Sequence, residues 1–197
     1  MRAKDLFCLI PLICGLAACS GNSGGTSAKT PEEYLAAGWS SYSQKNYADA
    51  LTNFTQAYQG KGSLTDAYNG AGWANARLGS LTAARDKFLQ GLTHDTANLQ
   101  ILAGLAFVYN AVKDYPSSVT DANHVLQINP AWFFSRDVSI TASDLELLLA
   151  EDYFAEGDFQ NSYIMVQSLD PTFTVDVSTD SGRIALASEI ERLRLLV

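Results

Sequence analysis

The segment 150–158, AEDYFAEGD, contains four carboxylates that are close enough in sequence to suggest acid–base chemistry. Paired carboxylates do such work when each is held in a suitable protonation state. The surrounding pattern, however, predicts a helix with a polar face followed by a turn, where charged side chains are normally solvated. We therefore interpret Glu151, Asp152, Glu156 and Asp158 as surface groups and not as a catalytic set.

Two histidines and three cysteines are the other groups that could bind a metal or attack a substrate. His94 and His124 have no metal-ligand spacing to each other or to a cysteine. The sequence also has no HExxH motif, phosphate-binding loop, dinucleotide-binding glycine pattern or nucleophile elbow. It predicts a protein that is not an enzyme and has no metal or cofactor; an enzyme with an unrecognised site is the weakest of the alternatives.

A period of 34 residues organises the middle of the chain. The tripeptide AGW occurs at 37–39 and again at 71–73. Large apolar and small residues keep the same interval, and a fixed period of this length is typical of stacked helical hairpins. The residues in phase are Tyr47, Leu81 and Tyr115; Ala50, Ala84 and Ser118; and Phe54 and Phe88.

This pattern resembles the tetratricopeptide repeat (TPR) family, in which each 34-residue unit folds as helix, turn and helix. The resemblance implies an all-α, right-handed helical-hairpin solenoid with about three and a half to four repeats. Thr30 with Glu33, and Ser143 with Glu146, are expected to form capping boxes. The predicted segments are three repeats at 31–130, an insertion at 131–142, a degenerate fourth repeat at 143–171 and a C-terminal capping helix at 181–197.

The N-terminus carries a targeting signal. Arg2 and Lys4 precede a short apolar run, and LAAC at 16–19 resembles the lipobox of bacterial lipoproteins. That resemblance implies a signal peptide at 1–18, lipidation of Cys19 and a flexible tether at 19–30; an ordinary signal peptide is the alternative. We expect a lipid anchor at the periplasmic face of the outer membrane, with the inner membrane as the other location.

Charge narrows the choice of partner. The net charge is -8, and it becomes about -9 when Arg2, Lys4 and Asp5 are removed with the signal. An acidic body argues against nucleic acid, whose binding depends on Lys and Arg. The expected partner is another envelope protein or an extended peptide, with the membrane contacted through the lipid.

Aromatic residues define the candidate binding groove. Trp39, Trp73 and Phe107 share one phase of the period, on first helices that line the concave face in the family. We expect at least Trp39 and Trp73 to expose part of their rings, spaced to suit an extended peptide; the alternative is that the rings wedge between helices. The full candidate set is Trp39, Tyr42, Asn69, Trp73, Arg77, Phe107 and Asn110.

The insertion contains three adjacent aromatics, Trp132, Phe133 and Phe134, which cannot all face one way. We expect the insertion either to pack back on the fourth unit or to offer an exposed contact. The favoured function is an interaction scaffold in envelope or pilus assembly. The alternative is a module that binds glycan or cell-wall fragments through exposed aromatics.

Overall fold

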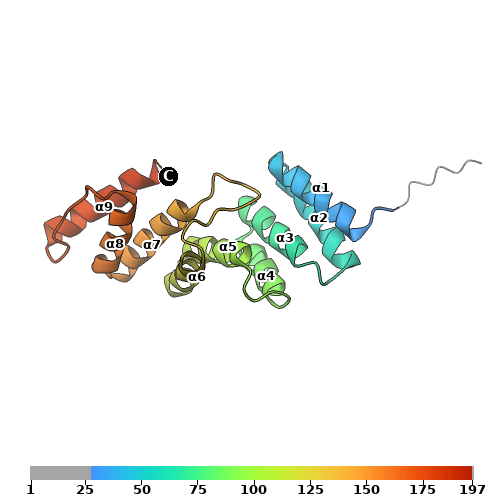
Figure 1. The fold of residues 1–197 in the computed structure, drawn as a ribbon, viewed down its shortest axis with the longest axis horizontal. Coiled ribbons are helices and arrows are strands. Elements are labelled where there is room, and N and C mark those ends of the chain that lie inside the picture. The colour runs from blue at the N-terminus through green and yellow to red at the C-terminus, as the bar shows by residue number, and fades with distance from the viewer. Residues whose placement is uncertain (1–27, 197) are drawn as a thin grey trace, which may run out of the picture.

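The computed structural model describes residues 28–196 and is all-α (Figure 1). Within this range nine helices follow one another, and the first eight form four antiparallel hairpins. The predicted signal peptide, Cys19 and most of the tether lie outside the described residues. The helices are α1 Pro31–Ser43, α2 Tyr47–Gly60, α3 Thr65–Arg77, α4 Leu81–Leu92, α5 Leu99–Ala111, α6 Tyr115–Ile128, α7 Ala142–Glu156, α8 Phe159–Leu169 and α9 Asp180–Arg194.

Each helix packs on its neighbours in sequence, as expected for a stack of hairpins. The first helices α1, α3, α5 and α7 also contact one another in succession, so they form one face of the stack. Figure 1 shows the long connection between α6 and α7 turning back toward α3. Among the described residues, no helix is both long and apolar enough to span a bilayer.

Glycines let phenylalanine rings pack in the first two hairpins. A Cβ on Gly38 or on Gly70 would collide with the ring of Phe54, so this ring lies tightly between α1 and α3. Gly72 and Gly104 enclose Phe88 in the same way. Both rings are fully buried, which explains why the glycines are kept despite their low helix propensity.

The third and fourth hairpins are joined internally by serines instead. The Ser118 hydroxyl of α6 donates to the carbonyl of Ala106 in α5 at 2.9 Å. The Ser162 hydroxyl of α8 donates to the carbonyl of Ala150 in α7 at 2.7 Å. Both serines are fully buried, so each hydrogen bond joins the two helices of its hairpin inside the core.

Local capping mostly follows the sequence. Thr30 and Glu33 form the expected capping box at α1. The box predicted for Ser143 and Glu146 is wrong, because the N-cap of α7 is Thr141, two residues before the predicted one, and the helix begins at Ala142. Its N-terminus is closed by the Asp144 carboxylate, which accepts from the Thr141 backbone N–H at 2.7 Å.

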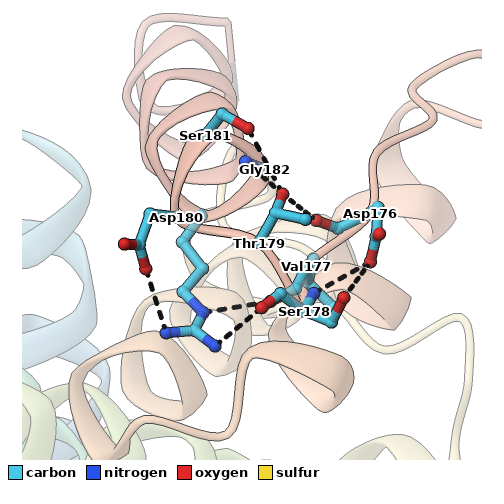
Figure 2. A network of polar contacts seen from close by, with 8 residues as sticks. Asp176, Val177, Ser178, Thr179, Asp180, Ser181 and Gly182 are labelled. Atoms are coloured by element: carbon cyan, nitrogen blue, oxygen red, sulfur yellow. Dashed lines mark hydrogen bonds and ion pairs between the residues drawn. The ribbon is translucent and has the colours of Figure 1, made fainter.

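The C-terminal helix covers the end of the stack. Leu186, Ile190 and Leu193 of α9 are buried against α7 and α8. The preceding turn is held by polar contacts (Figure 2): the Arg183 guanidinium donates to the carbonyls of Val177 and Ser178. The turn therefore fixes where α9 starts.

Candidate functional site

A loop covers the face formed by the first helices of the first three hairpins. We call residues 131–141 the covering loop, and its central contact is Phe134, which is fully buried. Its ring stacks on Trp73 with centroids 4.3 Å apart and planes inclined at 20°. It also meets Trp39 and Tyr42 edge-on, at centroid distances of 6.2 and 6.1 Å. Three rings from α1 and α3 thus enclose one ring of the loop.

Charged residues that follow this ring in the loop form ion pairs with α3. Asp137 accepts from Arg77 of α3 at 2.8 Å, and Arg136 donates to Asp66 of α3 at 3.1 Å. The Arg136 guanidinium also lies 4.7 Å from the ring centroid of Trp39, within the range of a cation–π contact. The charges of the loop are therefore complementary to those of the face that it covers.

Hydrogen bonds affect the ionisation of this cluster. The Ser139 hydroxyl bonded to Asp137, with help from the nearby Arg77, lowers the pKa of that carboxyl. Burial raises the pKa of Tyr42, although its oxygen accepts from Arg77 Nε at 3.4 Å. At neutral pH the Asp137 carboxylate is thus charged and the Tyr42 phenol is neutral.

The covering loop is shaped by its own backbone. The Phe134 N–H donates to the Ile140 carbonyl at 2.8 Å, and Phe133 forms an isolated antiparallel bridge with Thr141. Asp137 closes the tip by accepting from the Ser139 hydroxyl at 2.6 Å. The Gln100 side chain of α5 donates to the Phe133 carbonyl at 3.2 Å. The loop is thus a narrow turn, closed by its own hydrogen bonds, that packs against the helices.

The expected exposure of Trp39 and Trp73 is wrong. Their exposed fractions are 7% and 4%, because the loop covers them from one side. From the other side they pack on the core rings, Trp39 on Phe54 at 4.7 Å and Trp73 on Phe88 at 5.8 Å. Their indole N–H groups donate to Asp66 and to the Gln100 carbonyl. The rings thus take part in core packing and also form the floor of the groove.

Of the two expectations for the insertion, packing back on the fourth unit needs correction, whereas an exposed aromatic is present at Phe133. The insertion does not pack back on the fourth unit, since its central ring contacts α1 and α3. The three aromatics do point different ways: Trp132 and Phe134 are buried, whereas Phe133 is 51% exposed. The contact of Phe134 with α1 and α3 could not be predicted, because the sequence does not indicate which distant helices an insertion packs against.

Part of the groove remains open beside the loop. A cavity of about 320 Å³ lies between α3, α5 and the end of the loop. Phe107, the third aromatic of the predicted set, is partly buried there, and Arg77 and Asp144 also line the cavity. The remaining lining residues are Trp73, Ala76, Leu81, Val108, Ala111 and Ile140.

The two predicted asparagines lie at different places. Asn69 is buried beneath the loop, where its amide donates to Asp66 at 3.3 Å. Asn110 of α5 donates instead to Asp152 of α7, at 2.6 Å. Tyr42, Asn69, Trp73 and Arg77 are therefore brought together with Trp39, while Asn110 belongs to the contact between the third and fourth hairpins.

The acidic segment does not behave as one surface patch. Asp152 is fully buried, which contradicts its interpretation as a solvated group, and burial raises its pKa to about 6. Glu151 pairs with Arg194 of α9 at 2.8 Å, and Asp158 caps α8 through the Asn161 N–H. The carboxylates thus serve separate structural contacts.

The histidines are similarly dispersed. His94 stacks on Tyr68 with centroids 5.6 Å apart, and His124 is exposed on α6. Within residues 28–196, no group of three or more His, Cys, Asp or Glu side chains is arranged to hold a metal ion. The aromatic groove and its covering loop are therefore the candidate functional site.

Comparisons with known proteins agree on the fold. No family model matches the chain. A heat shock protein sti1 homologue of Schizosaccharomyces pombe is 41% identical over 66 residues, which are 34% of this chain and 11% of that protein. The chain therefore spans only a small part of this curated relative.

Solved structures extend the likeness over most of the chain. A structure of MamA AMB-1 superposes with a TM-score of 0.62 at 17% identity, covering 83% of this chain and 82% of that one. A tetratricopeptide repeat protein from Parabacteroides merdae gives a TM-score of 0.60 at 14% identity, covering 83% and 60%. The fold is thus that of tetratricopeptide repeat proteins, nine described helices in a packed helical-hairpin arrangement.

Proposed function

We propose that the protein is an interaction scaffold whose concave groove binds an extended segment of a partner protein. One observation carries this proposal: the groove already accommodates an inserted aromatic side chain, since the turn of the covering loop places Phe134 among the rings of Trp39, Tyr42 and Trp73. Helical-repeat folds commonly present such elongated concave surfaces to partners.

The physical character of the groove suits a peptide. Aromatic pairs in offset or edge-on geometry contribute about 0.5–1.5 kcal/mol beyond the burial of area, and Trp, Tyr and Arg are enriched in binding hot spots. The groove combines such rings with Asp66 and Arg77, which pair with charges on either side of a bound ring. The open cavity beside Phe107 extends the surface that a longer segment could occupy.

The proposal includes a place in the cell. We propose that Cys19 is lipidated and anchors the chain at the periplasmic face of the outer membrane, for envelope or pilus assembly. The support is the lipobox-like LAAC and the Gly/Ser-rich segment behind it. Two or three acyl chains hold a protein on a membrane stably, and about ten flexible residues reach roughly 16–19 Å.

The anchor is tested by Cys19→Ala in cells. We expect this variant to leave the membrane fraction or to accumulate as the precursor, with Cys14→Ala as the matched control that fractionates normally. Normal membrane fractionation and normal processing of Cys19→Ala would remove the lipid anchor from the proposal.

The groove is tested by site-specific photo-crosslinking in cells. A photoreactive residue at Phe107, which lines the open cavity, should crosslink to an envelope protein. The control is the same residue at Leu89, which is 43% exposed on α4. The proposal predicts a product that is specific to the Phe107 position and is weakened by Arg77→Glu. Equal products at both positions would contradict it.

The alternative of a glycan-binding module predicts a different result. Sugars stack on open aromatic faces, but the faces of Trp39 and Trp73 are enclosed. Retention of the protein on purified peptidoglycan, abolished by Phe133→Ala at the exposed ring and unaffected by Arg77→Glu, would favour that alternative over a peptide partner.

A further inference from the structure

The covering loop presents its side chains to the groove in a fixed order. Phe134 enters the ring cage, Arg136 pairs with Asp66, and Asp137 pairs with Arg77. The order along the loop is therefore aromatic, any residue, basic, acidic, with Ser135 exposed at the second position. The groove supplies a matching series of a ring cage, a carboxylate and a guanidinium.

We infer that the covering loop is an intramolecular ligand, and that the partner segment which replaces it has this same order of side chains. This inference rests on the proposed peptide-binding function and adds the chemistry of the partner and a competitor within the chain. The occupant to which it commits is a turn-forming segment with an aromatic residue, a variable residue, Arg or Lys, and Asp or Glu, because Phe134 to Asp137 form a turn closed by the bond from the Asp137 N–H to the Phe134 carbonyl at 3.0 Å.

The contacts of the loop are of a kind that another segment can replace. Both ion pairs are partly exposed: the side chains of Arg77 and Asp137 are 37% and 29% exposed, and those of Arg136 and Asp66 are 44% and 39% exposed. Exposed pairs of this kind contribute little to stability. The Gln100 bond to the Phe133 carbonyl is a contact with the main chain, which any peptide can offer.

The loop also leaves parts of the groove unused. Among the described residues, Oδ1 of Asn69 and Oε1 of Gln100 are buried acceptors without a hydrogen-bond partner. Both residues lie where α3 and α5 meet the loop, since Asn69 bonds to Asp66 and Gln100 bonds to Phe133. A segment whose backbone N–H groups reach these oxygens would form bonds that the loop lacks, because buried acceptors are normally satisfied.

The outer side of the loop is apolar as well. Phe133 is 51% exposed and Val138 is 70% exposed, so the loop keeps two large apolar side chains in solvent while its inner side is bound. Release of Phe134 would expose a ring that is now fully buried, and the incoming segment would offset this cost by covering the rings of the helices.

The effect of the competing loop on the apparent affinity of a partner peptide can be predicted. A tethered ligand acts at an effective concentration on the order of millimolar. The apparent affinity of a free peptide is reduced in proportion to the fraction of molecules whose groove is open. Opening the groove by mutation should therefore strengthen the binding of a free peptide, even though no contact is added.

The test uses a labelled, end-capped synthetic peptide of residues 131–142 as the probe, with the full mature chain. One variant replaces residues 132–140 by Gly and Ser at equal length. A second, Asp137→Lys, keeps the loop but repels it from Arg77. The matched control is Asp86→Lys on α4, whose carboxylate is 53% exposed and lies outside the groove.

Both loop variants should bind the peptide at least tenfold more tightly than the wild type and the control, by fluorescence anisotropy. A peptide with Phe134→Ala should lose that binding. If the Gly/Ser variant does not fold, Asp137→Lys decides alone. Equal binding by folded loop variants and wild type would overturn the inference of an intramolecular competitor.

The order of charges is tested separately, in the variant with the Gly/Ser loop, because that loop has no charge that could pair with either form of residue 77. Adding Arg77→Glu should weaken the binding of the native peptide and strengthen the binding of a peptide in which Asp137 is replaced by Arg. Equal binding of both peptides would overturn the stated partner chemistry. The outcome is distinct from the crosslinking test: peptide exchange without a Phe107-specific crosslink would uphold the competing loop and contradict the envelope partner.

Discussion

The two halves of the stack solve the same packing problem differently. In the first two hairpins, glycine pairs enclose Phe54 and Phe88. In the last two, buried serines bond to the facing helix, and Asp152 is buried beside Asn110. The first half is thus packed tightly around two rings, while the second uses buried hydrogen bonds between its helices. The covering loop arises within the second half, between α6 and α7, and lies on the first half.

The tight packing of the first half also supports the floor of the groove. Trp39 and Trp73 rest on the buried Phe54 and Phe88 and also receive Phe134. A rigid floor suits a binding surface, because preorganised side chains lose less freedom when a segment is bound. The C-terminal end has an apolar cluster of its own, in which α9 packs on α7 and α8.

The largest expected effect is on the first half. Phe88→Ala removes a fully buried ring that is enclosed by Gly72 and Gly104. The free energy of unfolding should fall by about 3–5 kcal/mol, as for other core aromatics, when measured by urea denaturation. A loss below about 1 kcal/mol would show that the tight packing assigned to this half is wrong.

Substituting a buried serine of the last two hairpins should lower the free energy of unfolding by less than Phe88→Ala does. Ser162→Ala leaves the Ala150 carbonyl without its donor in a fully buried position, which should lower the free energy of unfolding by about 1–3 kcal/mol. The control is Ser168→Ala, whose hydroxyl donates to Glu146 at the surface. If both substitutions have the same effect, the buried bond has no special role in this half.

The buried Asp152 in the second half should make the free energy of unfolding depend on pH. Its folded pKa of about 6 exceeds the usual 3.8, so the native state favours the neutral acid, and the resulting stabilisation is lost as pH rises toward and through 6. Unfolding free energy should be roughly 1 kcal/mol greater at pH 5 than at pH 7.5 from this group.

Asp152→Asn isolates that contribution. Asp121, whose pKa burial also raises to about 6, acts in the same direction and remains in the variant. The difference in unfolding free energy between pH 5 and pH 7.5 should therefore shrink without vanishing. An unchanged difference would show that Asp152 ionises normally in the folded protein.

The smallest effect is expected for the surface charges of the groove. Arg136→Ala breaks a partly exposed pair with Asp66, and the free energy of unfolding should change by less than about 1 kcal/mol. A double-mutant cycle of Arg136 and Asp66 would measure the coupling. A coupling well above that value would mean that the loop is an integral part of the fold and not a replaceable ligand.

Local and periodic features could be predicted from the sequence, and long-range contacts could not. The 34-residue phase gave the hairpins and the burial of Phe88, because each repeat packs mainly on its neighbours. The contact of Phe134 with Trp73 joins a residue of the insertion to a residue of the second repeat, so periodicity carries no information about it. The burial of Asp152 was likewise missed, because its partner Asn110 lies on another helix.

The direct test of the covered groove is the accessibility of Trp73. In a protein with Trp39→Phe and Trp132→Phe, Trp73 is the remaining tryptophan, and its fluorescence reports on the ring that stacks with Phe134. We predict blue-shifted emission and weak quenching by acrylamide, both reversed when Phe134→Ala is added. Strong quenching in the protein that retains Phe134, unchanged by Phe134→Ala, would show that the loop does not cover the groove and would contradict the account.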